Sequence, residues 1–193
     1  MPNPASRNPL VVAMTGATGA IMGVRLLEVL KDLGIPTELV MSEWAQKTIS
    51  LETGRTPGEV AALAGVVHPS RNLGASISSG SYQTAGMVVV PCSMKTLASI
   101  AAGSGGTLID RAADVTIKER RPLVLVARET PLSPIHLENM LKLSRIGVVV
   151  MPPVPAFYNH PTTIEDAVDH IVGRVLDQIG IESGLVRRWK LGG

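Results

Sequence analysis

The sequence predicts an α/β fold, in which helices cover both faces of a doubly wound parallel sheet in three layers. Two observations support this. Short runs that are apolar at every position alternate along the chain with amphipathic segments. Strands buried on both faces are typical of parallel sheets. The length of 193 residues suits one such domain. We therefore expect a single domain over 1–193, with a flexible start at 1–9 and a C-terminal tail at 182–193.

Five apolar runs predict the strands. Each is four or five residues long, and Gly, Pro, Ser or a charged residue follows each within two positions, which suits a strand that ends at a loop. Because helices separate these runs, we expect them to pair in parallel. The predicted strands are 10–14 (LVVAM), 37–41 (TELVM), 87–90 (MVVV), 123–126 (LVLV) and 148–151 (VVVM).

Periodicity and capping residues predict the helices. Ser42 is an N-cap candidate, and Thr162 with Glu165 matches the T-x-x-E capping box of the final helix. An apolar stripe from Ile164 to Ile179 continues that helix. The stretch 53–75, punctuated by Gly and Pro, predicts only one short helix. The expected helices cover 21–33, 44–50, 58–63, 95–102, 135–145 and 162–179.

Composition excludes several classes of protein. The net charge of +2 is too small for a general nucleic-acid binder, and the single cysteine, Cys92, excludes internal disulfides and a multi-cysteine zinc site. No apolar run has the length of a membrane span, and the first nine residues do not resemble a signal peptide. We therefore expect a cytoplasmic protein with no nucleic-acid or membrane partner. The mean hydropathy of +0.26 indicates surface buried against other subunits.

Aromatic residues make up only 3% of the chain, so the core must be aliphatic. Because so few aromatic side chains are present, their locations are informative. We expect them near the ligand-binding end of the sheet. They are Trp44, Tyr82, Phe157, Tyr158 and Trp189.

The ends of the predicted strands are where a ligand is expected, because doubly wound sheets bind ligands beyond the carboxyl ends of their strands. Arg128 directly follows a strand and suits a phosphate, since its planar fork makes paired hydrogen bonds. Ser93 is either a helix cap or a ligand contact, and Cys92 beside it is interpreted as a small buried hydrophobe. The hydroxyl-rich stretch 76–81 is either a solvated loop or a polar lid. The segments that directly follow predicted strands, where we expect the ligand, are 15–19, 42, 91–96, 127–131 and 152–161.

The first of these turns, Thr-Gly-Ala-Thr-Gly at 15–19, suits a phosphate or flavin cradle at a helix start. It also begins the T-G-x-x-G-x-x-G pattern of NAD(P) reductases. Gly23 lies one residue too late for that pattern, however, and Ser42 stands where a ribose-binding acid is expected. Neither Tyr82 nor Tyr158 has the Lys four residues later that such a reductase needs. A flavin is therefore favoured.

Together these segments resemble the UbiX-like flavin prenyltransferase family, which includes the B subunits of phenolic and aromatic-acid decarboxylase systems. The matching motifs run in order along nearly the whole chain. They are MTGATGA at 14–20, SLET at 50–53, SISSGS at 76–81, PCSMKTL at 91–97, RAADV at 111–115, KERRPLV at 118–124, RETP at 128–131, IHLENML at 135–141 and PPVPAFYNHP at 152–161.

The resemblance implies a flavodoxin-like or Rossmann-like fold and a homo-oligomer, namely a dodecamer. It implies a metal-independent prenyltransferase, which attaches a dimethylallyl group from dimethylallyl phosphate to N5 and C6 of reduced FMN. The prenylated FMN is then passed to a UbiD-type decarboxylase. The sequence does not determine whether the donor is the monophosphate or the diphosphate, or which decarboxylase uses the product.

The resemblance also implies roles for individual residues. Trp189 either closes the site or anchors an interface. Arg174 is expected at the substrate phosphate, although a surface ion pair with Asp177 is the alternative. Thr18 stands where better-known members have Ser. FMN contacts are implied for Gly16, Ala17, Thr18, Ser42, Ser93, Met94, Lys95, Thr96 and Arg128; substrate contacts for Tyr158, Arg174 and Lys118; and catalytic roles for Thr18, Glu52, Lys118, Glu129 and Arg111.

Three alternatives remain at this stage. A flavin-dependent cysteine decarboxylase shares the fold, but needs an Asn-containing helix start where this chain has Lys95 and Thr96. An NAD(P)-binding reductase fails the checks above. A non-catalytic FMN-carrier subunit would bind FMN without needing Tyr158, Lys118 or Arg174.

Overall fold

The computed structural model describes residues 8–186 and 188 and contains one six-stranded sheet. Every described strand pair is parallel, and the strand order is β3-β2-β1-β4-β5-β6. This is the order of the doubly wound Rossmann sheet, so the predicted fold class is confirmed. The strands are β1 (Leu10–Met14), β2 (Thr37–Met41), β3 (Val66–Pro69), β4 (Gly86–Cys92), β5 (Leu123–Ala127) and β6 (Val149–Val150).

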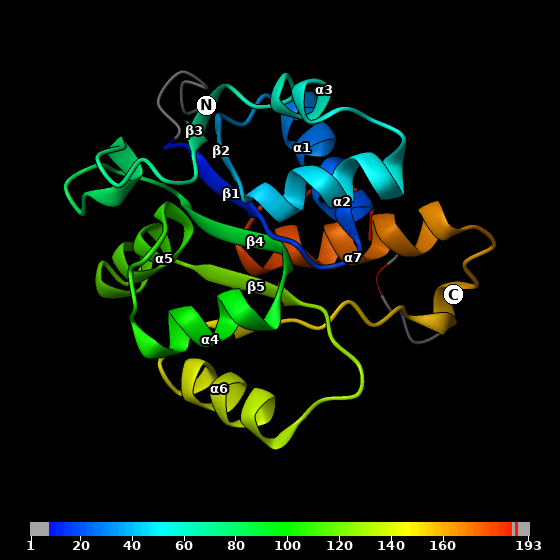
Figure 1. Cartoon of the computed structure of the whole chain (residues 1–193). Coiled ribbons are helices and arrows are strands. Elements are labelled where there is room, and N and C mark those ends of the chain that lie inside the picture. Colours follow the sequence, from blue (N-terminus) through cyan, green and yellow to red (C-terminus); the bar gives the residue numbers. More distant parts are fainter. Residues whose placement is uncertain (1–7, 187, 189–193) are drawn as a thin grey trace.

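Helices cover both faces of the sheet (Figure 1). Buried side chains form two clusters, one on each face, and the cluster to which a helix contributes assigns the helix to that face. One face carries α1 (Ala20–Asp32), α2 (Glu43–Thr53), α3 (Pro57–Ala61) and α7 (Ile164–Gln178). The other carries α4 (Met94–Ala102), α5 (Leu108–Lys118) and α6 (Pro134–Arg145). Two single-turn 3₁₀ helices, η2 (Ser76–Ser78) and η3 (Phe157–Asn159), lie in loops.

The core is aliphatic, as the composition predicts. Side chains of β1 alternate between the two faces: Leu10, Val12 and Met14 pack in one cluster, and Val11 and Ala13 pack in the other. None of the fully buried residues in either cluster is Phe, Tyr or Trp. Burying each such Val or Leu side chain stabilises the fold by roughly 1.5–3 kcal/mol.

Gly23 explains why α1 packs so closely on the sheet. A Cβ at this position would lie 2.6 Å from the carbonyl oxygen of Val90 in β4 and 2.6 Å from Cε of Met14. A larger residue would push the helix away from the strand. The third glycine of the Gly-rich segment therefore serves helix–sheet packing, a role it also has in dinucleotide-binding folds.

Two strands differ in length from the prediction. The strand at 87–90 extends through a cis Val90–Pro91 bond to Cys92, and its pairing with β5 shifts register between Val89 and Cys92. The strand at 148–151 is reduced to Val149–Val150 and is only half-buried. The reason is that β6 lies at the edge of the sheet and pairs on one side only.

Two elements have no counterpart in the prediction. The edge strand β3 is half-exposed, with a Val-Val-His-Pro sequence that shows no apolar alternation. Helix α5 lies in the charged middle segment, whose charges hid its apolar stripe. Its N-terminus carries a full capping box, in which Thr107 accepts from the amide of Asp110 and Asp110 accepts from the amide of Thr107. The T-x-x-D pattern at 107–110 was the signal that could have revealed it.

The start of the final helix was predicted one residue too early. Thr163 is the N-cap, and its capping-box partner is Asp166, not Glu165. The Thr162 hydroxyl donates to the same Asp166 carboxylate. Ile164 is 72% exposed and lies outside the buried stripe, whereas Val168, Ile171 and Val175 are buried as predicted. Within the described residues, no helix is long and apolar enough to cross a bilayer.

Candidate functional site

The carboxyl ends of β1 and β4 are joined by one buried hydroxyl. Thr15, 2% exposed, donates through Oγ1 to the carbonyl of Pro91 (2.8 Å) and accepts from the amide of Ser93 (2.8 Å). Beyond this point α1 leaves toward one face of the sheet and α4 toward the other. This is the topological switch point, where doubly wound sheets hold their ligands.

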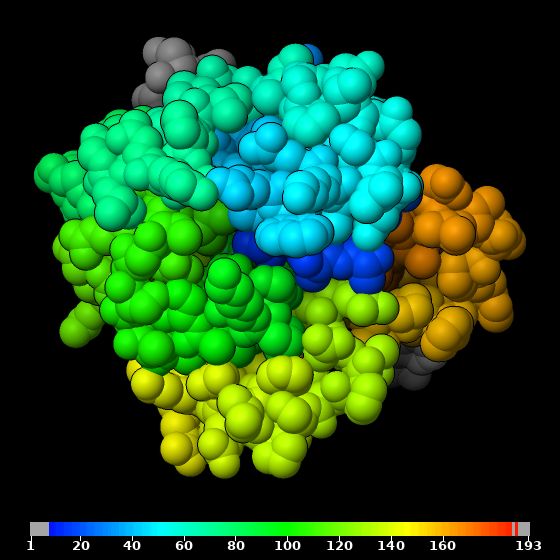
Figure 2. All heavy atoms as spheres, viewed as in Figure 1, coloured from blue at the N-terminus to red at the C-terminus, as the bar shows by residue number. Residues whose placement is uncertain are grey.

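The first turn lies directly beyond this bridge, and Figure 2 shows it in blue between α2 (cyan) and α4 (green). Gly16 packs closely on Trp44 of α2, because a Cβ at position 16 would collide with Cβ of Trp44. The Trp44 ring is 65% exposed, with the Lys47 ammonium 4.3 Å from its centroid. Ala17 and Thr18 complete the turn, and the Thr18 side chain is exposed.

Glu52 reaches this turn from the end of α2. Its Oε2 accepts hydrogen bonds from the amides of Gly19 (2.8 Å) and Ala20 (2.9 Å). The carboxylate therefore occupies the positive end of the α1 dipole, where a negative charge is stabilised. This contact brings the Glu52 carboxylate to the end of the turn that contains Thr18, although the two residues are far apart in sequence.

The start of α4 is the better candidate for binding an anion. The Ser93 hydroxyl accepts from the amide of Thr96 (3.3 Å) and donates to its hydroxyl (3.1 Å). The preceding amides, of Met94 and Lys95, have no partner inside the helix. The Lys95 side chain is exposed at the same helix end. On the neighbouring strand end, Ser42 caps α2 by accepting from the amide of Ala45 (3.0 Å).

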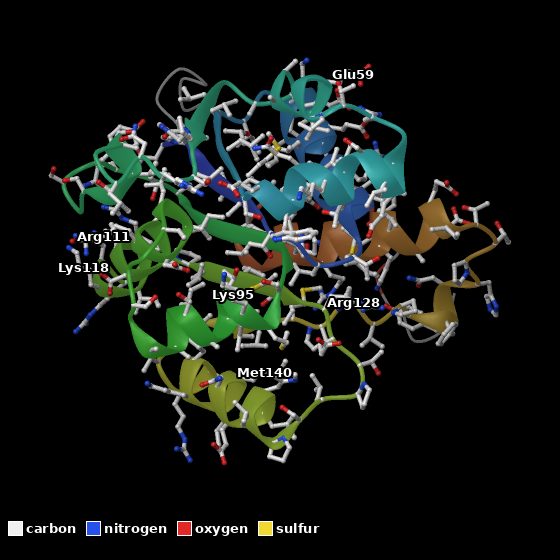
Figure 3. The ribbon with its side chains drawn as sticks, in the orientation of Figure 1. Glu59, Lys95, Arg111, Lys118, Arg128 and Met140 are labelled. Atoms are coloured by element: carbon white, nitrogen blue, oxygen red, sulfur yellow. The ribbon has the colours of Figure 1, made fainter. Side chains whose placement is uncertain are left out.

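Arg128 extends the site along the strand ends. Its amide donates to the carbonyl of Cys92 (3.2 Å), which holds the β5 end against β4. Its side chain is exposed and has no ion-pair partner in the part of the chain that the structure describes. Glu129, next in sequence, accepts from the amide of Thr130 (3.0 Å). Figure 3 labels Lys95 and Arg128, which extend from α4 and from the end of β5.

Cys92 belongs to the core, as the sequence predicts. The side chain is fully buried, and desolvation raises the pKa of the thiol. A thiol held in its neutral form is a poor nucleophile. Cysteine chemistry at this strand end is therefore disfavoured.

These strand ends fit a flavin phosphate. They present helix-start amides, Ser hydroxyls and two exposed cations, Lys95 and Arg128, which are the groups that bind phosphate in α/β folds. In residues 8–186 and 188, no three His, Cys, Asp or Glu side chains gather in a way that could hold a metal ion.

His170 lies close to both Tyr158 and Arg174. The Tyr158 ring meets the imidazole edge-on, with centroids 6.1 Å apart, and Asn159 Nδ2 lies 2.7 Å from His170 Nδ1. Burial and the nearby Arg174 charge lower the pKa of His170, so its neutral form is favoured. Arg174 pairs with Asp177 (2.8 Å), which is the alternative the sequence left open.

Arg111 and Lys118 are not brought to these strand ends within one chain. Both extend from α5, at the side of the molecule away from Arg128 (Figure 3). Arg111 pairs with Asp114 (2.8 Å) and Lys118 pairs with Glu119. The expected charged face is thus present. A site that contains both the strand-end groups and the two α5 cations would require a second copy of the chain. Trp189 lies outside the described residues.

Sequence reasoning missed two structural contributors to the site. Thr15 was seen only as the first residue of a Gly-rich turn, and its double hydrogen bond depends on β4, 76 positions later. Tyr82, expected near the ligand end of the sheet, instead donates to the buried Glu38 on β2. A Glu inside an apolar strand was the signal for the second contact.

Known proteins resemble this chain over nearly its whole length. The family model described as Flavoprotein matches residues 2–176. A probable UbiX-like flavin prenyltransferase of Streptomyces sp. (strain D7) is 61% identical over 93% of this chain and 90% of its own length. Flavin prenyltransferase UbiX of Escherichia coli (strain K12) is 54% identical over 94% of this chain and 97% of its own.

Solved structures agree. AnUbiX in complex with FMN and dimethylallyl pyrophosphate superposes with a TM-score of 0.95 at 54% identity, covering 97% of this chain and 100% of that one. A dodecameric FMN-dependent Ubix-like decarboxylase from Escherichia coli O157:H7 gives 0.93 at 58% identity, covering 94% and 99%. The peptidyl-cysteine decarboxylase EpiD gives 0.65 at only 16% identity over 91% and 99%, which shows the fold alone.

The Thr15 bridge can be tested with a pair of variants. Thr15→Val keeps the side-chain shape but leaves Ser93 N without its acceptor, so the free energy of unfolding should fall by about 1–3 kcal/mol. FMN affinity should also fall, because the start of α4 is no longer fixed. Thr15→Ser keeps the hydroxyl and should retain FMN affinity. Urea unfolding and flavin titration measure the two quantities, and equal FMN affinity in both variants would refute the role of the hydroxyl.

Proposed function

The chain belongs to the UbiX-like flavin prenyltransferase family, and we propose that it transfers a dimethylallyl group from dimethylallyl phosphate to N5 and C6 of reduced FMN. Bound at the strand ends, FMN would supply the electron-rich acceptor. Ser42, the α4 start (Ser93 to Thr96) and Arg128 would hold its phosphate, with Gly16, Ala17 and Thr18 along the first turn.

The observation that carries this proposal is the position of Glu52. Its carboxylate accepts hydrogen bonds from the amides of Gly19 (2.8 Å) and Ala20 (2.9 Å), at the end of the turn that contains Thr18. A carrier subunit needs an anion site but no acid beside it. An enzyme that forms a second bond at a ring carbon must remove a proton from that carbon. Glu52, together with the Thr18 hydroxyl, is placed to accept that proton.

The departing phosphate needs cations. When the carbon–oxygen bond breaks, the phosphate leaves with the electron pair, and positive groups stabilise the charge that develops. Arg174, Lys118 and Tyr158 have the chemistry for this task, since Arg binds phosphate in a bidentate manner and the phenol donates a hydrogen bond. Arg111 and Glu129 would belong to the same polar shell.

The active site is proposed to form between copies of the chain. One copy supplies Glu52 and Arg128 at the strand ends, and another supplies Arg111 and Lys118 from α5, because Figure 3 shows Arg128 on a different side of one chain from Arg111 and Lys118. Exposed Leu51, Ile135 and Phe157 provide apolar surface for such contacts. A homo-oligomer follows, and the dodecamer described for the Escherichia coli O157:H7 relative is the proposed assembly.

The product is proposed to serve a UbiD-type decarboxylase, which uses prenylated FMN as its cofactor. We place the reaction in the cytoplasm, where reduced flavin is supplied and where a free thiol such as Cys92 persists.

The activity is tested by incubating the protein anaerobically with reduced FMN and either dimethylallyl monophosphate or diphosphate. We expect the flavin to gain the mass of one dimethylallyl group in place of one proton, and the filtrate to activate a separately purified UbiD-type apoenzyme. Mass spectrometry and a decarboxylation assay read the result. An unchanged flavin with both donors would contradict the proposal.

The role of Glu52 is tested by Glu52→Gln. The amide oxygen can still accept from Gly19 and Ala20, so FMN affinity and folding should be retained. The variant cannot carry a proton, so product formation should fall by about 100-fold or more. The matched control is Glu59→Gln, because Glu59 also caps a helix start but lies away from the strand ends (Figure 3). Product formation equal to that of the control would remove Glu52 from the chemistry.

A further inference from the structure

A buried acid lies on β2, outside every role described above. Glu38 is only 3% exposed, and it is the one charged residue of its buried strand. Its carboxylate receives hydrogen bonds from three separate segments: His68 Nε2 of β3 (2.7 Å), the Ser76 hydroxyl of η2 (3.5 Å) and the Tyr82 phenol. A buried carboxylate is tolerated only when it is bonded in this way. Glu38 therefore holds the segment containing Ser76 and Tyr82 to the sheet.

Tyr82 donates one of these three hydrogen bonds to Glu38. The hydrogen bond to Glu38, with burial, raises the pKa of the phenol, so it stays protonated at neutral pH. The backbone around Tyr82 is held from the opposite side by Arg121. That guanidinium donates to the carbonyls of Tyr82 (2.8 Å) and Gly80 (2.8 Å), and to the Thr84 hydroxyl (3.2 Å). We name residues 76–84 the anchored loop, because Glu38 and Arg121 fix it at both sides.

The anchored loop touches the two cations of α5. The carbonyl of Ser78 accepts from Arg111 Nε (3.2 Å). At Gly80 the backbone packs on the Lys118–Glu119 pair so closely that an added Cβ would lie 2.6 Å from Lys118 Nζ. Long Lys and Arg side chains lose considerable rotamer entropy when a ligand fixes them. A loop that already restricts them lowers this cost of binding.

We propose that Glu38 and Tyr82 are positioning residues, which hold the anchored loop so that Arg111 and Lys118 are set to receive the prenyl phosphate. This inference rests on the proposed function, because that function gives Arg111 and Lys118 their ligand. Glu38 and Tyr82 touch neither FMN nor substrate. Their effect is on the affinity for the phosphate donor.

The test is Tyr82→Phe, which removes one hydroxyl and leaves the ring. The KM for dimethylallyl phosphate should rise about fivefold, as expected from one lost hydrogen bond. The values of kcat and of FMN affinity should stay at those of the wild type. Glu38→Gln retains an oxygen acceptor for the Tyr82 phenol, so its donor KM should stay near the wild-type value.

The matched control is Thr37→Val. Thr37 precedes Glu38 on the same strand, is buried, and donates to the carbonyl of Ile35 without contacting the anchored loop. It should lower the free energy of unfolding but leave the donor KM unchanged. A donor KM in Tyr82→Phe equal to that of this control would overturn the positioning role alone. A wild-type protein that makes no prenylated flavin would overturn the proposed function and this role with it.

Discussion

The site depends on the double hydrogen bond of the Thr15 side chain. Where β1 and β4 end, the chain leaves toward opposite faces of the sheet. The carbonyl of Pro91 accepts from both the amide and the hydroxyl of Thr15, and the same buried hydroxyl accepts from the amide of Ser93. An unpaired buried polar group costs about 1–3 kcal/mol, so this bridge keeps the crevice from opening. The first turn and the start of α4 take their positions from it.

Charge is divided along the strand ends in a way that suits two different tasks. The positive end of α1 is already occupied by the Glu52 carboxylate. The start of α4 carries no acid in its first turn and has the exposed Lys95 beside it. An acid that can exchange a proton and a site that attracts an anion therefore lie near each other without competing for the same helix end.

Sequence patterns predicted the buried parts of the fold well, because the buried strands are largely apolar, with Thr37 and Glu38 of β2 as exceptions. They failed where burial is partial: β3 is half-exposed, and α5 hides an apolar stripe beneath charges. At 162–166 two Thr and two acids give two overlapping capping-box patterns, and the structure uses Thr163 with Asp166. The roles of Glu52 and Arg128 stay predictions from the family motifs, and long-range contacts such as Thr15 to Ser93 could not be predicted from local patterns.

A shared active site is the central claim, since one chain holds the strand-end groups and the α5 cations on different sides. Mixed oligomers of Glu52→Gln and Lys118→Ala test it most directly. Each variant alone should make little prenylated flavin. Unfolding both together and reassembling them should restore product, because some sites then combine intact Glu52 from one copy with intact Lys118 from another. Mixed oligomers that assemble fully and remain inactive would contradict a site built between copies.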